Sequence, residues 1–123
     1  MTATFIIYGR LPSLNEVIGA NRSNRYAGAN LKRRVQSDIG WAIRAFALKP
    51  IAGPVAVSVT WYEANRRRDV DNVSSSIKFI LDALVKCGIL AGDGQRHVTS
   101  VSHTVAVDRL NPRIVVTLEQ VTT

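Results

Sequence analysis

The sequence has little of what several classes of protein require. It holds one cysteine, Cys87, so no disulfide can form within the chain, and the apolar helical run around it predicts a buried thiol. No apolar run approaches the roughly 18 residues of a membrane-spanning helix. Residues 1–8 lack the basic start and the small-residue cleavage site of a signal peptide. We therefore expect a cytoplasmic protein with no membrane segment.

Histidines and phosphate-binding motifs are also scarce. The two histidines, His97 and His103, come with no cysteine cluster, which argues against a zinc enzyme. The chain contains no glycine-rich phosphate loop and no Ser-His-Asp order. We therefore expect no nucleotide cofactor and no nucleotide hydrolysis.

Negative charge is sparse as well, because 9 Asp and Glu residues stand against 16 Lys and Arg residues and leave a net charge of +7. The basic residues cluster in the first 68 positions, and those we expect to bind DNA are Arg25, Lys32, Arg33, Arg66, Arg67 and Arg68. This clustering favours a partner with dense negative charge, such as nucleic acid. A basic surface without a partner is the alternative.

At 123 residues, with 46% hydrophobic and 20% charged residues, the chain fits one domain over residues 1–123. The spacing of apolar residues predicts strands at 4–8, 54–63, 97–107 and 113–119, one helix at 29–47, and a second helix that Asn72 caps and Gly88 ends. The order is β-α-β-α-β-β, which predicts an α/β (α+β) two-layer sandwich with a mixed sheet.

Three further expectations concern particular segments. Residues 10–28 show no period and predict a long functional loop. The last two strands are expected to form a hairpin. Trp41 and Trp61 predict core packing, with a protein-interaction surface as the alternative.

Asp69 and Asp71 stand two apart in a segment that we expect to be extended. An extended backbone points both carboxylates to one side, where they form a clamp for a hard cation such as Mg²⁺. The alternative is that they complement the dipole of the following helix, which suits Asp71 better than Asp69.

The second helix adds a lysine and another carboxylate. On a continuous helix, Asp71, Lys78 and Asp82 share one stripe, although a surface ion pair is the better explanation of Lys78 and Asp82 when those two residues are taken alone. Asp93 lies between two glycines in a turn after this helix, where an aspartate usually serves the backbone. Together the three aspartates and Lys78 suit metal-dependent hydrolysis of a phosphodiester, with Arg66 to Arg68 holding the flanking phosphates.

The same segments resemble a known family. Arg68-Asp69-Val70-Asp71-Asn72, Lys78-Phe79-Ile80-Leu81-Asp82-Ala83-Leu84, Gly88-Ile89-Leu90 and Asp93-Gly94-Gln95 are similar to the motifs of the RusA-type Holliday-junction resolvases. The similarity is dense over about thirty residues, and Leu11-Pro12-Ser13-Leu14-Asn15 and the predicted order of elements agree with it.

The resemblance implies a homodimer that introduces paired nicks into Holliday junctions and related branched DNA. It assigns Asp69, Asp71 and Asp93 as catalytic residues and ligands of Mg²⁺, with Mn²⁺ as a possible substitute, and Lys78 as the catalytic lysine. Two departures stand out: Lys78 lies seven residues after Asp71 rather than four, and Gly92 replaces an additional acid, a role that Asp82 could take. The rival function is a non-catalytic nucleic-acid-binding accessory protein.

Overall fold

The protein is built on a four-stranded mixed sheet. The computed structural model describes residues 1–121, apart from the side chains at positions 14, 21, 23 and 25. The strands β1 (Thr2–Tyr8), β2 (Val55–Glu63), β3 (Val98–Val107) and β4 (Arg113–Gln120) lie in the order β1-β4-β2-β3. β4 runs antiparallel to both of its neighbours, whereas β3 runs parallel to β2. The mixed sheet and its four strands agree with the prediction.

The expected hairpin between the last two strands is wrong. β4 lies between β1 and β2, and β3 pairs with the far side of β2. The backbone N–H of Asp108, just after β3, donates to the carbonyl of Glu63 at 2.8 Å, so the connection crosses the end of β2. The reason is burial: Ile114, Val116 and Leu118 of β4 are at most 3% exposed and need a central position, whereas much of β3 stays exposed.

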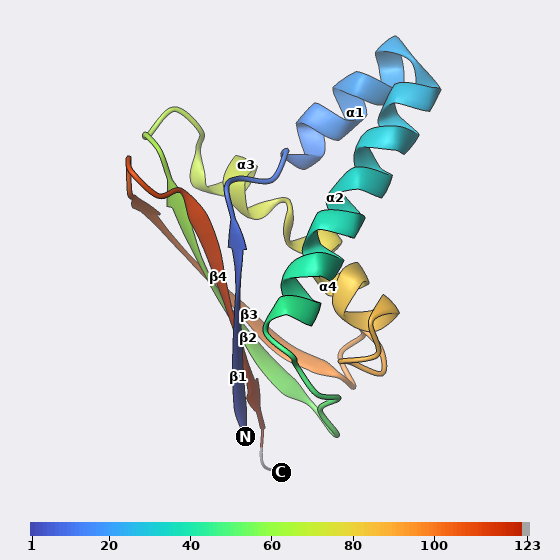
Figure 1. Cartoon of the computed structure of the whole chain (residues 1–123), viewed down its shortest axis with the longest axis vertical. Helices are drawn as coiled ribbons and strands as arrows, with labels where there is room; N and C mark the ends of the chain where they lie inside the picture. Colours follow the sequence, from blue (N-terminus) through green and yellow to red (C-terminus); the bar gives the residue numbers. More distant parts are fainter. Residues whose placement is uncertain (122–123) are drawn as a thin grey trace.

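The helices form the second layer on one face of the sheet (Figure 1). They are α1 (Leu14–Ser23), α2 (Arg25–Ala45), α3 (Val70–Ser74) and α4 (Ile77–Lys86). α2 packs against α1, α4 and β1, while α3 packs against β3. This two-layer arrangement confirms the predicted α+β sandwich. No helix among residues 1–121 is both long and apolar enough to cross a bilayer.

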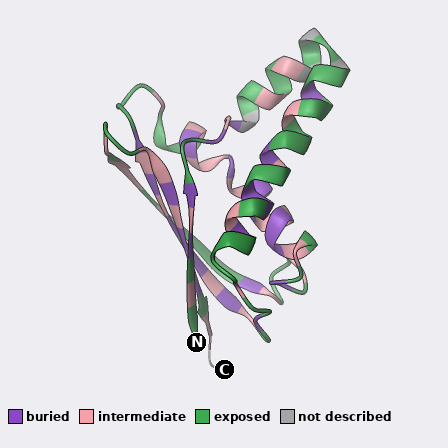
Figure 2. Cartoon of the chain, viewed as in Figure 1, coloured by how far each residue is buried: buried purple, intermediate pink, exposed green. Residues whose placement is uncertain are grey.

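The long loop expected at residues 10–28 is instead mostly helical. Ser13 accepts a hydrogen bond from the N–H of Glu16 at 3.1 Å and begins α1, and Asn24 caps α2 by accepting from Tyr26 (2.8 Å) and Ala27 (3.4 Å). Ser-x-x-Glu is the sequence of a capping box, which is typical of the start of a helix. The far ends of α1 and α2 project beyond the sheet and carry many exposed residues (Figure 2).

The predicted second helix is two helices. Asp69, not Asn72, occupies the N-cap position of α3, and the chain turns at Ser75 and Ser76 before α4. The hydroxyl of Ser75 donates to the carbonyl of Asn72 (2.7 Å) and that of Ser76 to the carbonyl of Pro12 (2.6 Å). Such side-chain bonds compete with regular helix and explain the break.

The end of α4 agrees with the prediction that Gly88 stops the helix. Gly88 has a φ of 75°, a conformation that glycine adopts at little cost. Its N–H donates to the carbonyl of Val85 (3.0 Å), and the N–H of Ile89 donates to that of Leu84 (2.9 Å). These two bonds form a Schellman motif.

The core lies between the sheet and the helices. Trp61 is 2% exposed and lies within it, as predicted, but Trp41 is 67% exposed on α2, so core packing is wrong for Trp41. Cys87 is only partly buried, although the sequence predicted a buried thiol. It follows α4 directly as the C-cap residue, which places it at the margin of the core.

Candidate functional site

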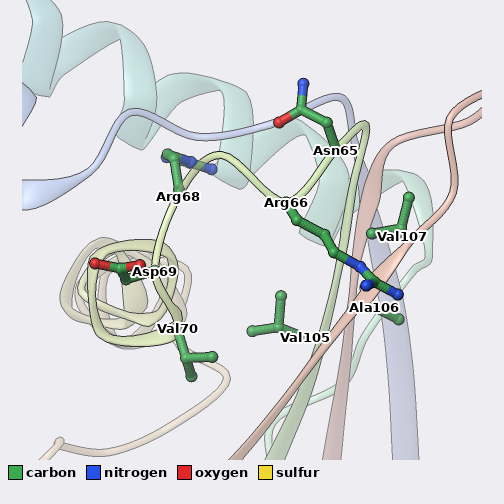
Figure 3. Close-up of a pocket in the computed structure, with 8 residues that line it drawn as sticks. All are labelled: Asn65, Arg66, Arg68, Asp69, Val70, Val105, Ala106 and Val107. Atoms are coloured by element: carbon green, nitrogen blue, oxygen red, sulfur yellow. The ribbon is translucent and has the colours of Figure 1, made fainter.

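The segment that leaves β2 forms one wall of a cavity of about 340 Å³, called here the Asp69 cavity. Its lining residues are Asn65, Arg66, Arg68, Asp69, Val70, Val105, Ala106 and Val107 (Figure 3). Because β2 and β3 are parallel, the residues that follow β2 meet the last residues of β3 at one end of the sheet. The side chain of Asn65 accepts a hydrogen bond from the N–H of Arg67 at 3.0 Å, which turns the chain off the strand.

Asp69 is one of the residues that line this cavity, and it is exposed. The residue has extended backbone angles (φ −70°, ψ 158°) and precedes α3, but its side chain forms no capping hydrogen bond. An aspartate at this position usually accepts a backbone N–H of the first turn. Capping of α3 therefore does not explain why an aspartate stands at position 69.

Arg68 was expected to bind DNA, but it is engaged inside the protein. Its guanidinium donates to the carboxylate of Glu63 at 2.8 Å and to the carbonyl of Leu11 at 3.2 Å, and it lies 3.7 Å from the carboxylate of Glu16. The side chains of Arg68 and Glu63 are only 11% and 10% exposed. Arg68 thus ties the segment to β2 and to the segment before α1, and phosphate binding would require breaking these bonds.

Arg66 and Arg67 fit the expectation better, because both are exposed. In Figure 3 the side chain of Arg66 extends toward β3. Lys32 and Arg33 are exposed on α2, well away in sequence from the Asp69 cavity. The side chain of Arg25, also expected to bind DNA, lies outside the described residues.

Asp71 does not share the extended backbone that the sequence predicted for it, because it lies within α3. Its carboxylate is exposed and accepts the N–H of Asn72 at 3.0 Å. The two aspartates are therefore placed by the start of a helix rather than by the alternation of a strand.

Lys78 and Asp82 form an ion pair of 3.4 Å on α4, with the lysine side chain 67% exposed. The break between α3 and α4 removes the continuous helix on which Asp71 would share their stripe. The surface ion pair, which the sequence left as an alternative, is thus what the structure contains.

Asp93 lines a different cavity, of about 280 Å³, called here the Asp93 cavity. The residues around it come from α2, α4 and the turn after α4, and they are Lys32, Gln36, Asp82, Val85, Lys86 and Asp93. Both polar atoms of the Gln36 side chain are buried without a hydrogen-bond partner among the described residues. The sequence does not predict Gln36 and Lys86 as site residues, because their positions do not indicate that α2 packs against α4.

A side chain at position 92, where the sequence has Gly92, would meet the ring of His97. A Cβ atom at position 92 would lie 2.7 Å from Cδ2 of His97, which is too close for any side chain unless the ring moves. His97 therefore occupies the space that a residue at this position would need, and Gly92 cannot be exchanged for an acid without rearrangement.

The three aspartates do not meet within one chain. Among the residues that the structure describes, no three His, Cys, Asp or Glu side chains gather closely enough to hold a metal ion. Asp69 lines one cavity and Asp93, with Asp82, lines another. The described residues of the chain thus do not fit the three-carboxylate metal site that the resemblance implies.

Comparisons with known proteins do not assign the chain to a family. No protein-family model matches the chain, and a search of curated proteins finds no significant match.

Proposed function

We propose that this chain is a Mg²⁺-dependent endonuclease that nicks Holliday junctions and related branched DNA as a homodimer, as its resemblance to the RusA resolvases implies. The observation that carries the proposal is Asp69, an exposed residue that lines a cavity together with Arg66 and Arg68 and whose side chain caps no helix. Hard cations such as Mg²⁺ prefer carboxylate oxygens, and Asp71 offers a second such group two residues away.

The basic residues support DNA as the substrate. Arg66 and Arg67 are exposed beside Asp69, where they can hold phosphates on either side of a scissile bond. Arg68 has a positioning role instead, since its bonds to Glu63 and Leu11 fix the path of the chain that carries Asp69. The net charge of +7 favours association with DNA in general.

The separation of Asp69 from Asp93 favours the rival function, a nucleic-acid-binding protein without catalysis. Such a protein would use the same arginines for phosphate and would need no metal. It predicts tight binding of branched DNA with no cleavage product under any ionic condition.

Cleavage of a synthetic four-way junction separates the two functions. The wild type should nick the junction with Mg²⁺ and stop when the ion is chelated. Asp69→Asn and Asp71→Asn should each lose about 100-fold or more, the size expected when a group that stabilises the transition state is removed. Asp38→Asn, an exposed aspartate on α2, is the matched control and should cut like the wild type. Equal cutting by Asp71→Asn and the wild type contradicts the proposal, and binding without nicks supports the rival.

A further inference from the structure

The stretch from residue 17 to residue 37 holds most of the protein's net positive charge. Of the 16 Lys and Arg residues in the chain, five stand in this stretch, and none of the 9 Asp and Glu residues does. The five basic residues are Arg22, Arg25, Lys32, Arg33 and Arg34. This stretch therefore carries five of the seven net charges of the chain.

The same five residues lie where α1 and α2 project beyond the sheet, a part called here the helical arm (residues 14–34). Arg22, Arg33 and Arg34 are exposed, and none of the three forms an ion pair with another described residue. Like charge gathered in one place opposes the compact fold unless a partner of opposite charge neutralises it. The arm therefore suits a polyanion.

The order of the basic residues on α2 points to a groove of double-stranded DNA. Lys32, Arg33 and Arg34 are consecutive, and successive residues turn by about 100° around a helix axis, so their side chains leave α2 on sides about 200° apart. The major groove of B-DNA admits one α-helix, and phosphates run along both of its rims. Positive charge on two sides of one helix matches phosphates on two sides of one groove.

The base of the arm is tied to the segment that follows β2. Arg68 of that segment donates to the carbonyl of Leu11 at 3.2 Å, just before α1, and lies 3.7 Å from the carboxylate of Glu16 in the first turn of α1. These contacts hold the start of the arm in a fixed place relative to the exposed Arg66 and Arg67.

The protein thus has two basic surfaces at one end of the molecule. The turn that follows β2, which carries Arg66 and Arg67, and the far ends of α1 and α2 lie on opposite sides of α3 (Figure 1). The duplexes of a branched DNA diverge from one point, so two of them can occupy two separate surfaces at once. A linear duplex that lies on one surface leaves the other without phosphate.

We infer that the helical arm holds a second duplex of a branched DNA while Arg66 and Arg67 hold the first. The choice of branched DNA rests on the proposed function, and the inference deepens that function by naming the part of the chain that distinguishes a junction from a linear duplex. It involves neither a metal ion nor cleavage, so binding alone can test it.

Affinities for a four-way junction and for a linear duplex of equal length, both measured in EDTA, test the inference. The wild type should bind the junction more tightly. Arg33→Ala combined with Arg34→Ala should lower the affinity for the junction about 10-fold or more, and lower the slope of log affinity against log salt by about 1.8 for two lost phosphate contacts. Its affinity for the duplex should fall less than about threefold, because Arg66 and Arg67 remain.

Arg44→Ala combined with Lys49→Ala is the matched control, because it removes the same charge from exposed positions outside the arm. It should bind both DNAs like the wild type, and circular dichroism verifies that both double variants fold. The inference is overturned if the arm variant keeps the wild-type affinity for the junction, if it weakens binding of both DNAs equally, or if the control loses as much.

The binding and nicking assays also separate this inference from the proposed function. A wild type that binds junction and duplex equally overturns the inference, even if it nicks the junction. A wild type that prefers the junction, and loses that preference in the arm variant, supports the second duplex even if it nicks no junction. The last result would refute the nuclease function alone.

Discussion

Val57 and Val101 lie side by side on β2 and β3 and face the helices, yet Val57 is 1% exposed and Val101 is 37% exposed. The helical layer covers three of the four strands, β1, β4 and β2, and leaves much of β3 exposed. The three covered strands supply most of the hydrophobic stabilisation from the sheet, while β3 is held largely by its backbone pairing with β2. The end of β3 lines the Asp69 cavity.

The largest expected effect compares two arginines that stand two residues apart. Arg68→Ala leaves the buried carboxylate of Glu63 without its partner and should lower the free energy of unfolding by about 3–5 kcal/mol. Arg66→Ala changes an exposed side chain and should alter it by less than about 0.5 kcal/mol. Denaturant unfolding of both variants measures the difference, and equal stabilities would show that the internal ion pair contributes little.

Val57 and Val101 allow a comparison of buried and exposed positions with the same substitution, valine to alanine. Val57→Ala opens a cavity in the core and should cost about 2 kcal/mol or more. Val101→Ala should cost less than about 1 kcal/mol in the monomer, because part of its side chain is already in water. If Val101→Ala proves as costly as Val57→Ala at low protein concentration, where the monomer dominates, Val101 is buried as completely as Val57.

DNA binding should depend on the exposed arginines of the segment that follows β2. Replacing both Arg66 and Arg67 by alanine should weaken binding of any duplex or junction. Each lost phosphate contact should reduce the slope of log affinity against log salt by about 0.9. Arg109→Ala, also at an exposed arginine, is a matched control outside the proposed interface with DNA. An unchanged salt slope in the double variant would remove these arginines from the DNA-binding surface.

The smallest effect expected is on pH dependence. Burial lowers the pKa of His103 below its ordinary value of 6.5, and its Nδ1 accepts the indole N–H of Trp61 at 3.0 Å. Well above pH 6.5 His103 is neutral in both the folded and the unfolded chain, so the stability is fully present. As pH falls below 6.5 the unfolded chain takes up the proton first, and stability is lost until the pKa of the folded state is passed. His103→Gln should flatten thermal stability between pH 7 and 5, and an unchanged pH profile would exclude His103 as the cause.

The sequence predicted the elements whose signals are local. Alternation in β2 and the apolar spacing of α2 were sufficient to locate both elements, and Gly88 marked the end of α4. The Ser-x-x-Glu signal at Ser13 is present, but the turn-forming residues around it predict a loop where α1 lies. The break before α4 depends on a hydroxyl of Ser76 that reaches the carbonyl of Pro12, a contact between distant positions.

The candidate site was less predictable, because its geometry depends on how strands pair. Spacing indicated Asp69, Asp71 and Asp93 as a group, but a parallel β2–β3 pair puts Asp69 near the end of β3 and Asp93 before its start. In the same way, three consecutive arginines looked equivalent, and only the packing of Glu63 and Leu11 separates Arg68 from Arg66 and Arg67. Neither the separation of Asp69 from Asp93 nor the different role of Arg68 can be predicted from local sequence.

Nicking of a synthetic four-way junction by the wild type and by Asp69→Asn tests the central claim most directly. The account predicts nicks that require Mg²⁺ in the wild type and about 100-fold slower nicking by Asp69→Asn. Equal nicking by the two proteins, or no nicking by the wild type with Mg²⁺, would contradict it.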